Sequence, residues 1–93
     1  MEDKMLDWVE EKCREVQLLY EFYTQYRDQL QDRVANLSES RFFNEAIHQT
    51  VQTMNIYYAK FSQGYRDVSQ VCHILGGKYL EVFEEHFKEG SYI

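Results

Sequence analysis

Proline is absent from this 93-residue chain, and glycine occurs only four times. Proline would remove a backbone hydrogen-bond donor and clash with the preceding turn, so its absence permits very long helices. Cysteine is rarer still, because Cys13 and Cys72 are the only two in the sequence, and each lies within an apolar pattern. We interpret them as buried, reduced thiols of a cytoplasmic protein rather than as a disulfide.

Positive charge is also scarce. Ten Lys and Arg residues face 16 Asp and Glu residues, which gives a net charge of −6. A nucleic-acid-binding face needs clustered Lys and Arg, and anionic membranes attract basic segments. We therefore expect neither nucleic acid nor a membrane as a partner.

No long apolar run is present either. No stretch approaches the ~20 apolar residues that span a bilayer, and the first residues, MEDKMLDWVEE, lack the basic and apolar regions of a signal peptide. We expect a cytoplasmic location, with signal-independent export left open.

Apolar and aromatic residues are abundant by contrast, at 44% and 16% of the chain. In the first part of the sequence they recur in steps of three and four, which is typical of a helix that packs in a coiled coil or bundle. The pattern predicts a helix over about residues 2–37, with Arg27 as its one interruption. Its members are Leu6, Val9, Cys13, Val16, Tyr20, Tyr23, Leu30, Val34 and Leu37. A second apolar stripe runs beside it through Met5, Trp8, Leu19, Phe22 and Tyr26.

The stretch NLSESRF interrupts this pattern and predicts a tight turn at about residues 37–41. Asn36 tolerates the left-handed conformation that ends many helices, and Ser38 or Ser40 can cap the helix that follows.

A second helix is predicted over about residues 41–75. Its apolar frame is Ile47, Val51, Met54, Tyr58, Phe61, Tyr65, Val68, Cys72 and Leu75, with Phe43, Tyr57 and Val71 beside it. Gly64, Gly76 and Gly77 fall at flanking or outer positions of this frame.

Gly76 and Gly77 raise the question of where the second helix ends. Two adjacent glycines inside a helix would cost about 2 kcal/mol relative to alanines, and an antiparallel partner helix would come level at this point. We predict a break here and a short third helix over about residues 78–88, which docks on its own hairpin near Met5 and Trp8 or on a partner. The alternative is one straight helix over about residues 41–89, because the apolar frame continues in phase across the glycines.

The sequence thus predicts a single all-α domain, residues 1–93. It is an antiparallel hairpin of two long helices with a short C-terminal helix. The second stripe leaves more apolar surface than one hairpin can bury, so we expect assembly into a four-helix bundle, with a second copy or with another helical protein. The predicted interface consists of Trp8, Leu19, Phe22, Tyr26, Tyr57, Val71, Leu80, Phe83 and Phe87.

Candidate chemistry is sparse. Glu45 and His48 form a Glu-x-x-His pair of the kind found in di-iron bundles, and a metal-binding bundle is one alternative function. The nearest acids across the turn flank the expected seam, so we favour a solvated surface pair. His73 and His86 lack partners at ligand spacing and are expected to be exposed or near helix ends. We therefore expect no catalytic residue, no cofactor and no metal, and thus no enzyme.

The outline of a proline-free helical hairpin resembles the WXG100 proteins and the small helical partners of type VII secretion effectors. At the turn, NLSES stands where that family has Trp-x-Gly, and Tyr79 is followed four residues later by Phe83 rather than by an acid. The resemblance implies a chaperone or targeting partner of a secreted helical protein, which is the alternative to a general interaction module. Small helical subunits of eukaryotic coiled-coil assemblies have the same outline.

Overall fold

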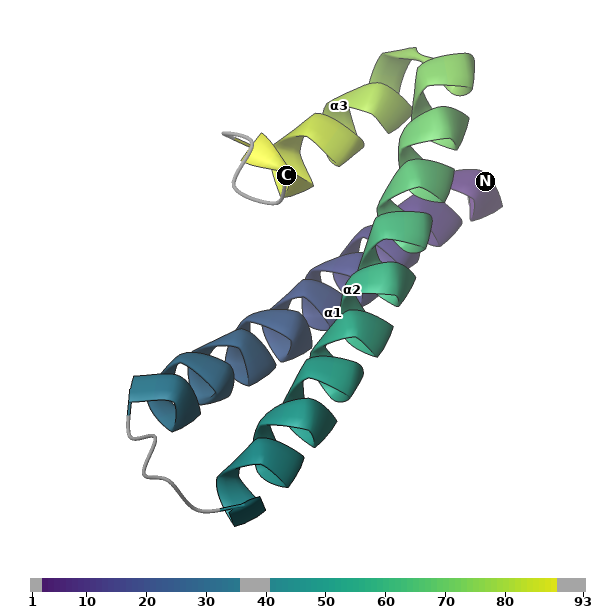
Figure 1. Ribbon diagram of the computed structural model, residues 1–93. Helices are drawn as coiled ribbons and strands as arrows, with labels where there is room; N and C mark the ends of the chain where they lie inside the picture. The colour runs from purple at the N-terminus through teal and green to yellow at the C-terminus, as the bar shows by residue number, and fades with distance from the viewer. Residues whose placement is uncertain (1–2, 36–40, 89–93) are drawn as a thin grey trace.

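The computed structural model describes residues 3–35 and 41–88, with side chains from residue 45 onward in the second segment (Figure 1). It confirms the predicted all-helical class, because the described residues form three helices and no strand. These are α1 (Lys4–Ala35), α2 (Arg41–Leu75) and α3 (Gly77–His86). The predicted turn at residues 37–41, with Asn36, Ser38 and Ser40, falls almost wholly outside the described residues.

The helices α1 and α2 lie side by side and antiparallel, and α3 returns from the end of α2 toward α1 (Figure 1). Asp3 defines the start of α1, since its Oδ1 accepts hydrogen bonds from the backbone N–H groups of Met5 and Leu6, both at 3.1 Å. These donors have no partner within the helix, so an aspartate at this position stabilises the first turn.

The core is concentrated in the part of the hairpin that α3 covers. Eight apolar side chains are buried there: Val9, Cys13, Val16, Phe61, Val68, Cys72, Phe83 and Phe87. Toward the connection between α1 and α2, Thr50 is the one buried residue among those described. Val34 and Tyr58, which the sequence pattern assigned to the seam, are 50% and 51% exposed, because only two helices are present at this level.

Gly64 lies where α1 and α2 approach closely. A Cβ atom added to Gly64 would come within 2.9 Å of Cγ2 of Val16, a distance that real Cβ atoms do not tolerate. Of its two predicted settings, Gly64 therefore takes the flanking one, at the edge of the seam between the two helices. The missing side chain is what lets the two backbones come together.

The predicted break at Gly76 and Gly77 is present. Gly76 has φ 65° and ψ −161°, a combination open essentially to glycine alone, and Gly77 has φ 53°. Gly76 donates the last hydrogen bond of α2, to the carbonyl of Cys72, and its own carbonyl accepts from Tyr79 in the first turn of α3. The chain thus reverses within two residues, and the straight-helix alternative is wrong.

The helix α3 docks on its own hairpin along α1, from Asp3 to Gln17. At its start, the Tyr79 hydroxyl donates to Oδ2 of Asp3 at 2.8 Å, and the Lys78 ammonium pairs with the same carboxylate. At its end, Nε2 of Gln17 donates to the carbonyl of His86 at 3.0 Å. Docking on the hairpin was one of the two predicted outcomes, but its contacts follow α1 to Gln17 and reach α2 at Tyr65 rather than centring on Met5 and Trp8.

Candidate interaction face

Six of the nine predicted interface residues lie on one face of the hairpin. On α1, Trp8, Leu19, Phe22 and Tyr26 are separated by 11, 3 and 4 residues, spacings that return to the same side of a helix. On α2, Tyr57 and Val71 are separated by 14 residues. All six are partly buried, so each keeps part of its surface in water.

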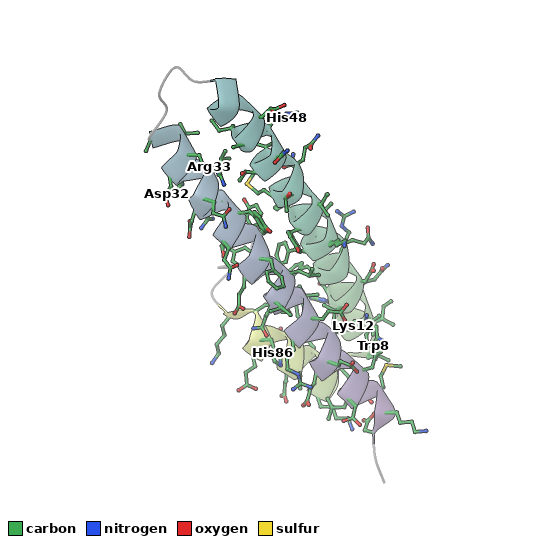
Figure 2. The ribbon with its side chains drawn as sticks, turned by 90° about the horizontal axis from the view of Figure 1, so that it is seen from below. Trp8, Lys12, Asp32, Arg33, His48 and His86 are labelled. Atoms are coloured by element: carbon green, nitrogen blue, oxygen red, sulfur yellow. The ribbon has the colours of Figure 1, made fainter. Side chains whose placement is uncertain are left out.

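A groove of about 550 Å³ runs between α1 and α2 on this face. Figure 2 places Trp8 and Lys12 on one side of α1 and His86, from α3, on the other. None of the described α3 residues lines the groove. Its floor is formed in part by Val16 and Gly64, so the glycine that allows close helix contact also leaves the hollow. The full lining is Trp8, Lys12, Glu15, Val16, Leu19, Lys60, Gln63, Gly64, Asp67 and Val68. We call this surface, together with the residues that extend it at either end, the open face.

The open face continues beyond both ends of the groove. Near the start of α1, a second hollow of about 320 Å³ is lined by Lys4, Met5, Trp8 and Val71. Toward the connection, the Tyr57 ring stacks on Tyr26 with centroids 5.5 Å apart, and it contacts Phe22 at 5.2 Å. A strip of apolar side chains thus follows the two helices from Met5 to Tyr26.

Charges of both signs border the groove in equal number. On α1, Nζ of Lys12 lies 3.2 Å from Oε2 of Glu15, and the opposite rim on α2 carries Lys60 and Asp67. These four formal charges cancel, although the chain as a whole carries −6. The groove therefore lacks the repulsive net charge of the rest of the surface.

The remaining three predicted interface residues, Leu80, Phe83 and Phe87, belong to α3 and face its own hairpin. Phe83 is 5% exposed and Phe87 8% exposed, and both rings contact Tyr65, with centroids 5.5 and 5.1 Å away. Leu80 packs against the same core. These side chains already pack within the chain, so they are not part of the open face.

His86 lies at the end of α3, as one of its two predicted settings required, and it is partly buried against Gln17 rather than exposed. The Gln17 amide nitrogen donates to the His86 carbonyl, so its Oε1 faces the ring, where it lies 3.1 Å from Nδ1. An amide oxygen only accepts, which places a proton on Nδ1 of His86. A glutamine between apolar positions of α1 was the sequence signal for this contact, but nothing in the sequence pointed to His86 as its partner.

The candidate metal pair lies apart from the open face. Glu45 and His48 are exposed, and Nε2 of His48 lies 3.2 Å from Nε2 of Gln52. His73 is exposed as predicted; its ring lies 2.7 Å from the Ser69 carbonyl and edge-on to Phe83. Across residues 3–35 and 41–88, no group of three His, Cys, Asp or Glu side chains could hold a metal ion.

The two thiols are buried and unbridged. Burial raises the pKa of the Cys13 thiol to about 12, with a further contribution from nearby Cys72, whose pKa is raised by burial as well. Neither thiol is a nucleophile in this state, because the thiolate is the reactive form.

Comparison with known proteins gives no relative: no protein-family model, curated protein or solved structure matches the chain. Among the helices of the described residues, none combines the length and the apolar character needed to cross a membrane.

Proposed function

We propose that this protein is a non-enzymatic interaction module, whose open face binds a helical partner to form a four-helix bundle. The observation that carries the proposal is the groove between α1 and α2, with the apolar strip that extends it from Met5 to Tyr26.

The size of the open face supports an interface rather than scattered apolar residues. From Met5 to Tyr26 the α1 helix rises about 32 Å, and two packed helices are about 20 Å wide, so the projected area is about 600 Å². A stable protein interface buries about 800 Å² of accessible surface on each partner, and accessible surface exceeds its projection. Each Å² of apolar surface on the open face that a partner removes from water contributes about 25 cal/mol to the free energy that favours association.

A pair of helices is the occupant that best matches this shape. The groove lies parallel to two antiparallel helices and is bordered by side chains at helical spacing. Side chains of a second helical pair can enter it, as ridges enter grooves in helix bundles. With α3 on the other side of the hairpin, such a partner would complete a second layer without displacing any described contact.

The described cysteines and histidines support binding at the groove rather than catalysis there. Cys13 and Cys72 are held protonated by burial, and His86 is held by Gln17. The rings of His48 and His73 are engaged by neighbouring residues on their own helix. None of these groups lines the groove.

Adjacent leucines on α1 provide a matched test of the open face. Leu19 lines the groove, whereas Leu18 is 49% exposed and does not. We would purify the tagged full chain at native abundance from its native source as wild type, Leu19→Glu and Leu18→Glu, and identify the associated proteins by mass spectrometry. We expect Leu19→Glu to lose the partner, or a second untagged copy, and Leu18→Glu to retain it.

Circular dichroism of each variant checks that its helices are intact. Since Leu19 also contacts the core, Val71→Glu in the second hollow serves as an independent variant of the same face. Association that survives both Leu19→Glu and Val71→Glu would contradict the proposed function.

A further inference from the structure

We propose that the occupant of the open face is a second copy of this chain, with α1 of each copy lying on α2 of the other and both hairpins pointing the same way. This inference rests on the proposed function and adds the partner and its orientation. It follows from how residues at the same level of α1 and α2 complement one another.

The antiparallel pairing of α1 and α2 fixes which of their residues lie at the same height along the hairpin, that is, at the same level. Val16 lies against Gly64, and the ring of Tyr57 lies against Phe22 and Tyr26. Counting along the two helices from Val16 and Gly64 in opposite directions brings Lys12 close to the level of Asp67, and Trp8 close to the level of Val71. The shared hollow of Trp8 and Val71 agrees with this register.

A two-fold axis that runs along the groove places α1 of one copy over α2 of the other. Rotation about such an axis does not shift residues along the helices, so residues that are level within one chain are also level between the two copies. It therefore brings Lys12 opposite Asp67 of the second copy, and Lys60 within reach of Glu15 of that copy. Each of these contacts is attractive and occurs twice, because a two-fold interface repeats every contact. The four charges at the rim of one copy thus face opposite charges at the rim of the second copy.

The same axis also pairs the apolar residues. Trp8 comes onto Val71 of the second copy, and Phe22 and Tyr26 come onto its Tyr57. Leu19 comes near the level of Gly64 of the second copy. There the groove is hollow because glycine has no side chain, so a large residue of one copy lies opposite a small one of the other. Large residues opposite small ones give the interdigitation that bundle cores need.

Charge selects this face for self-association. Two copies that each carry −6 repel one another when acidic surfaces meet, whereas the rim of the groove is neutral. In the resulting bundle each long helix has only antiparallel neighbours, as in up-down bundles, so the helix dipoles oppose one another.

The test is a charge exchange between two otherwise identical chains. Lys12→Glu places a glutamate opposite Asp67 in its own homodimer, and Asp67→Lys places two lysines opposite each other. We expect each variant alone to self-associate about tenfold more weakly than wild type in sedimentation velocity, since both symmetry-related contacts change from attractive to repulsive. Net repulsion alone predicts the opposite for Asp67→Lys, which makes the chain less acidic.

An equimolar mixture of the two variants is the decisive measurement. The glutamate introduced into one chain then meets the lysine introduced into the other, and the native Lys12 and Asp67 meet as well. We therefore expect heterodimers to form to within about threefold of wild-type affinity. A mixture of Lys12→Glu with wild type is the control and should recover clearly less, because its glutamate still meets Asp67. Charge repulsion within each chain is unchanged by mixing, so recovery reports the contact between chains.

The orientation is checked by spin labels on Gln52→Cys, an exposed position on α2 away from the groove. Hairpins pointing the same way bring the two labels to about 20–30 Å, whereas hairpins pointing in opposite directions separate them by more than about 40 Å. The buried Cys13 and Cys72 leave the introduced thiol as the reactive one.

A monomer at micromolar concentration, no recovery on mixing, or widely separated labels would each overturn the inference. None of these results would overturn the proposed function, which fails only if the Leu19→Glu and Val71→Glu variants keep their partners. A monomer whose binding to a different helical protein is lost on Leu19→Glu would retain the function and reject the second copy as the occupant.

Discussion

The phenolic hydroxyl of Tyr79 and the carboxylate of Asp3 lie 2.8 Å apart, although 76 residues separate them in the sequence. The same carboxylate caps α1 through Met5 and Leu6 and pairs with Lys78. One side chain therefore fixes the start of α1 and the start of α3 together. Loss of its charge should affect the third helix before it affects the hairpin.

Acid should weaken this contact within a defined pH range. The Lys78 and Tyr79 side chains, together with the N–H of Leu6, lower the pKa of Asp3 from 3.8 to about 2. A carboxyl group whose pKa is lower in the folded state stabilises the fold above its unfolded pKa, and this contribution is lost as the pH falls. We expect the loss to occur between about pH 4 and pH 2.

The variant Asp3→Asn separates this charge from the capping role, because asparagine is an equally good cap. We expect the melting temperature of wild type to fall more than that of Asp3→Asn as the pH is lowered from about 4 to about 2. The difference between the two decreases reports the contribution of the Asp3 charge. Parallel curves for the two proteins would show that the negative charge of Asp3 contributes nothing to stability.

The two glycines between α2 and α3 should respond unequally to alanine. Beyond the neighbouring residues and the backbone of its own helix, no described atom lies within 4 Å of a Cβ added at either position, so the cost comes from the backbone conformation. A non-glycine residue in the left-handed region costs roughly 1–2 kcal/mol, and the ψ of −161° at Gly76 is still less accessible. We expect both variants to lower the free energy of unfolding in urea, Gly76→Ala more than Gly77→Ala.

Asparagine at position 77 is the matched control, since it tolerates the left-handed conformation and should restore part of the loss. A rise in stability for Gly76→Ala would instead mean that α2 and α3 form one continuous helix in solution.

The long helices and their break could be predicted from the sequence because both are local. Apolar spacing marks the helix faces, and adjacent glycines mark the reversal. The sequence left open whether α3 docks on its own hairpin or on a partner, because the contacts that decide it join Gln17 to His86 and Asp3 to Tyr79 across most of the chain. No periodicity encodes such polar pairs.

The close approach at Gly64 could not be predicted for a different reason. The seven-residue frame gives its flanking position, but the distance between the two backbones there depends on which residue of α1 lies opposite, here Val16. The open face was predictable through its apolar spacing. The neutral rim of the groove was not predictable, because the sequence does not show which charged residues of α1 and α2 lie at the same level.

The thiols should be silent in the folded protein. Burial raises the pKa of Cys13 to about 12 and raises that of Cys72, so almost no thiolate is present at about pH 8, and reagents have no access. We expect a disulfide reagent such as Ellman's to titrate no thiol in native buffer and two in concentrated guanidinium. Rapid native labelling of both would contradict the burial of this part of the core.

The contact of Gly64 with Val16 should be one of the least tolerant in the hairpin. Alanine is the better helix former by about 1 kcal/mol, so Gly64→Ala would stabilise α2 if the space allowed. The added Cβ would come 2.9 Å from Cγ2 of Val16, which is 1% exposed and stiff at χ1, so neither group can move aside. We expect a net loss of roughly 1–3 kcal/mol in the free energy of unfolding, as for other overpacked sites.

A double-mutant cycle with Val16→Ala isolates that clash. Val16→Ala alone removes buried methyl groups and should cost about 1–2 kcal/mol, yet it also removes the atom that a methyl group at position 64 would meet. The loss in the double variant should therefore be smaller than the sum of the two single losses, with a coupling of at least about 1 kcal/mol. Additive losses, measured by urea unfolding, would mean that the helices separate at this level and that the floor of the groove is looser than the fold described here.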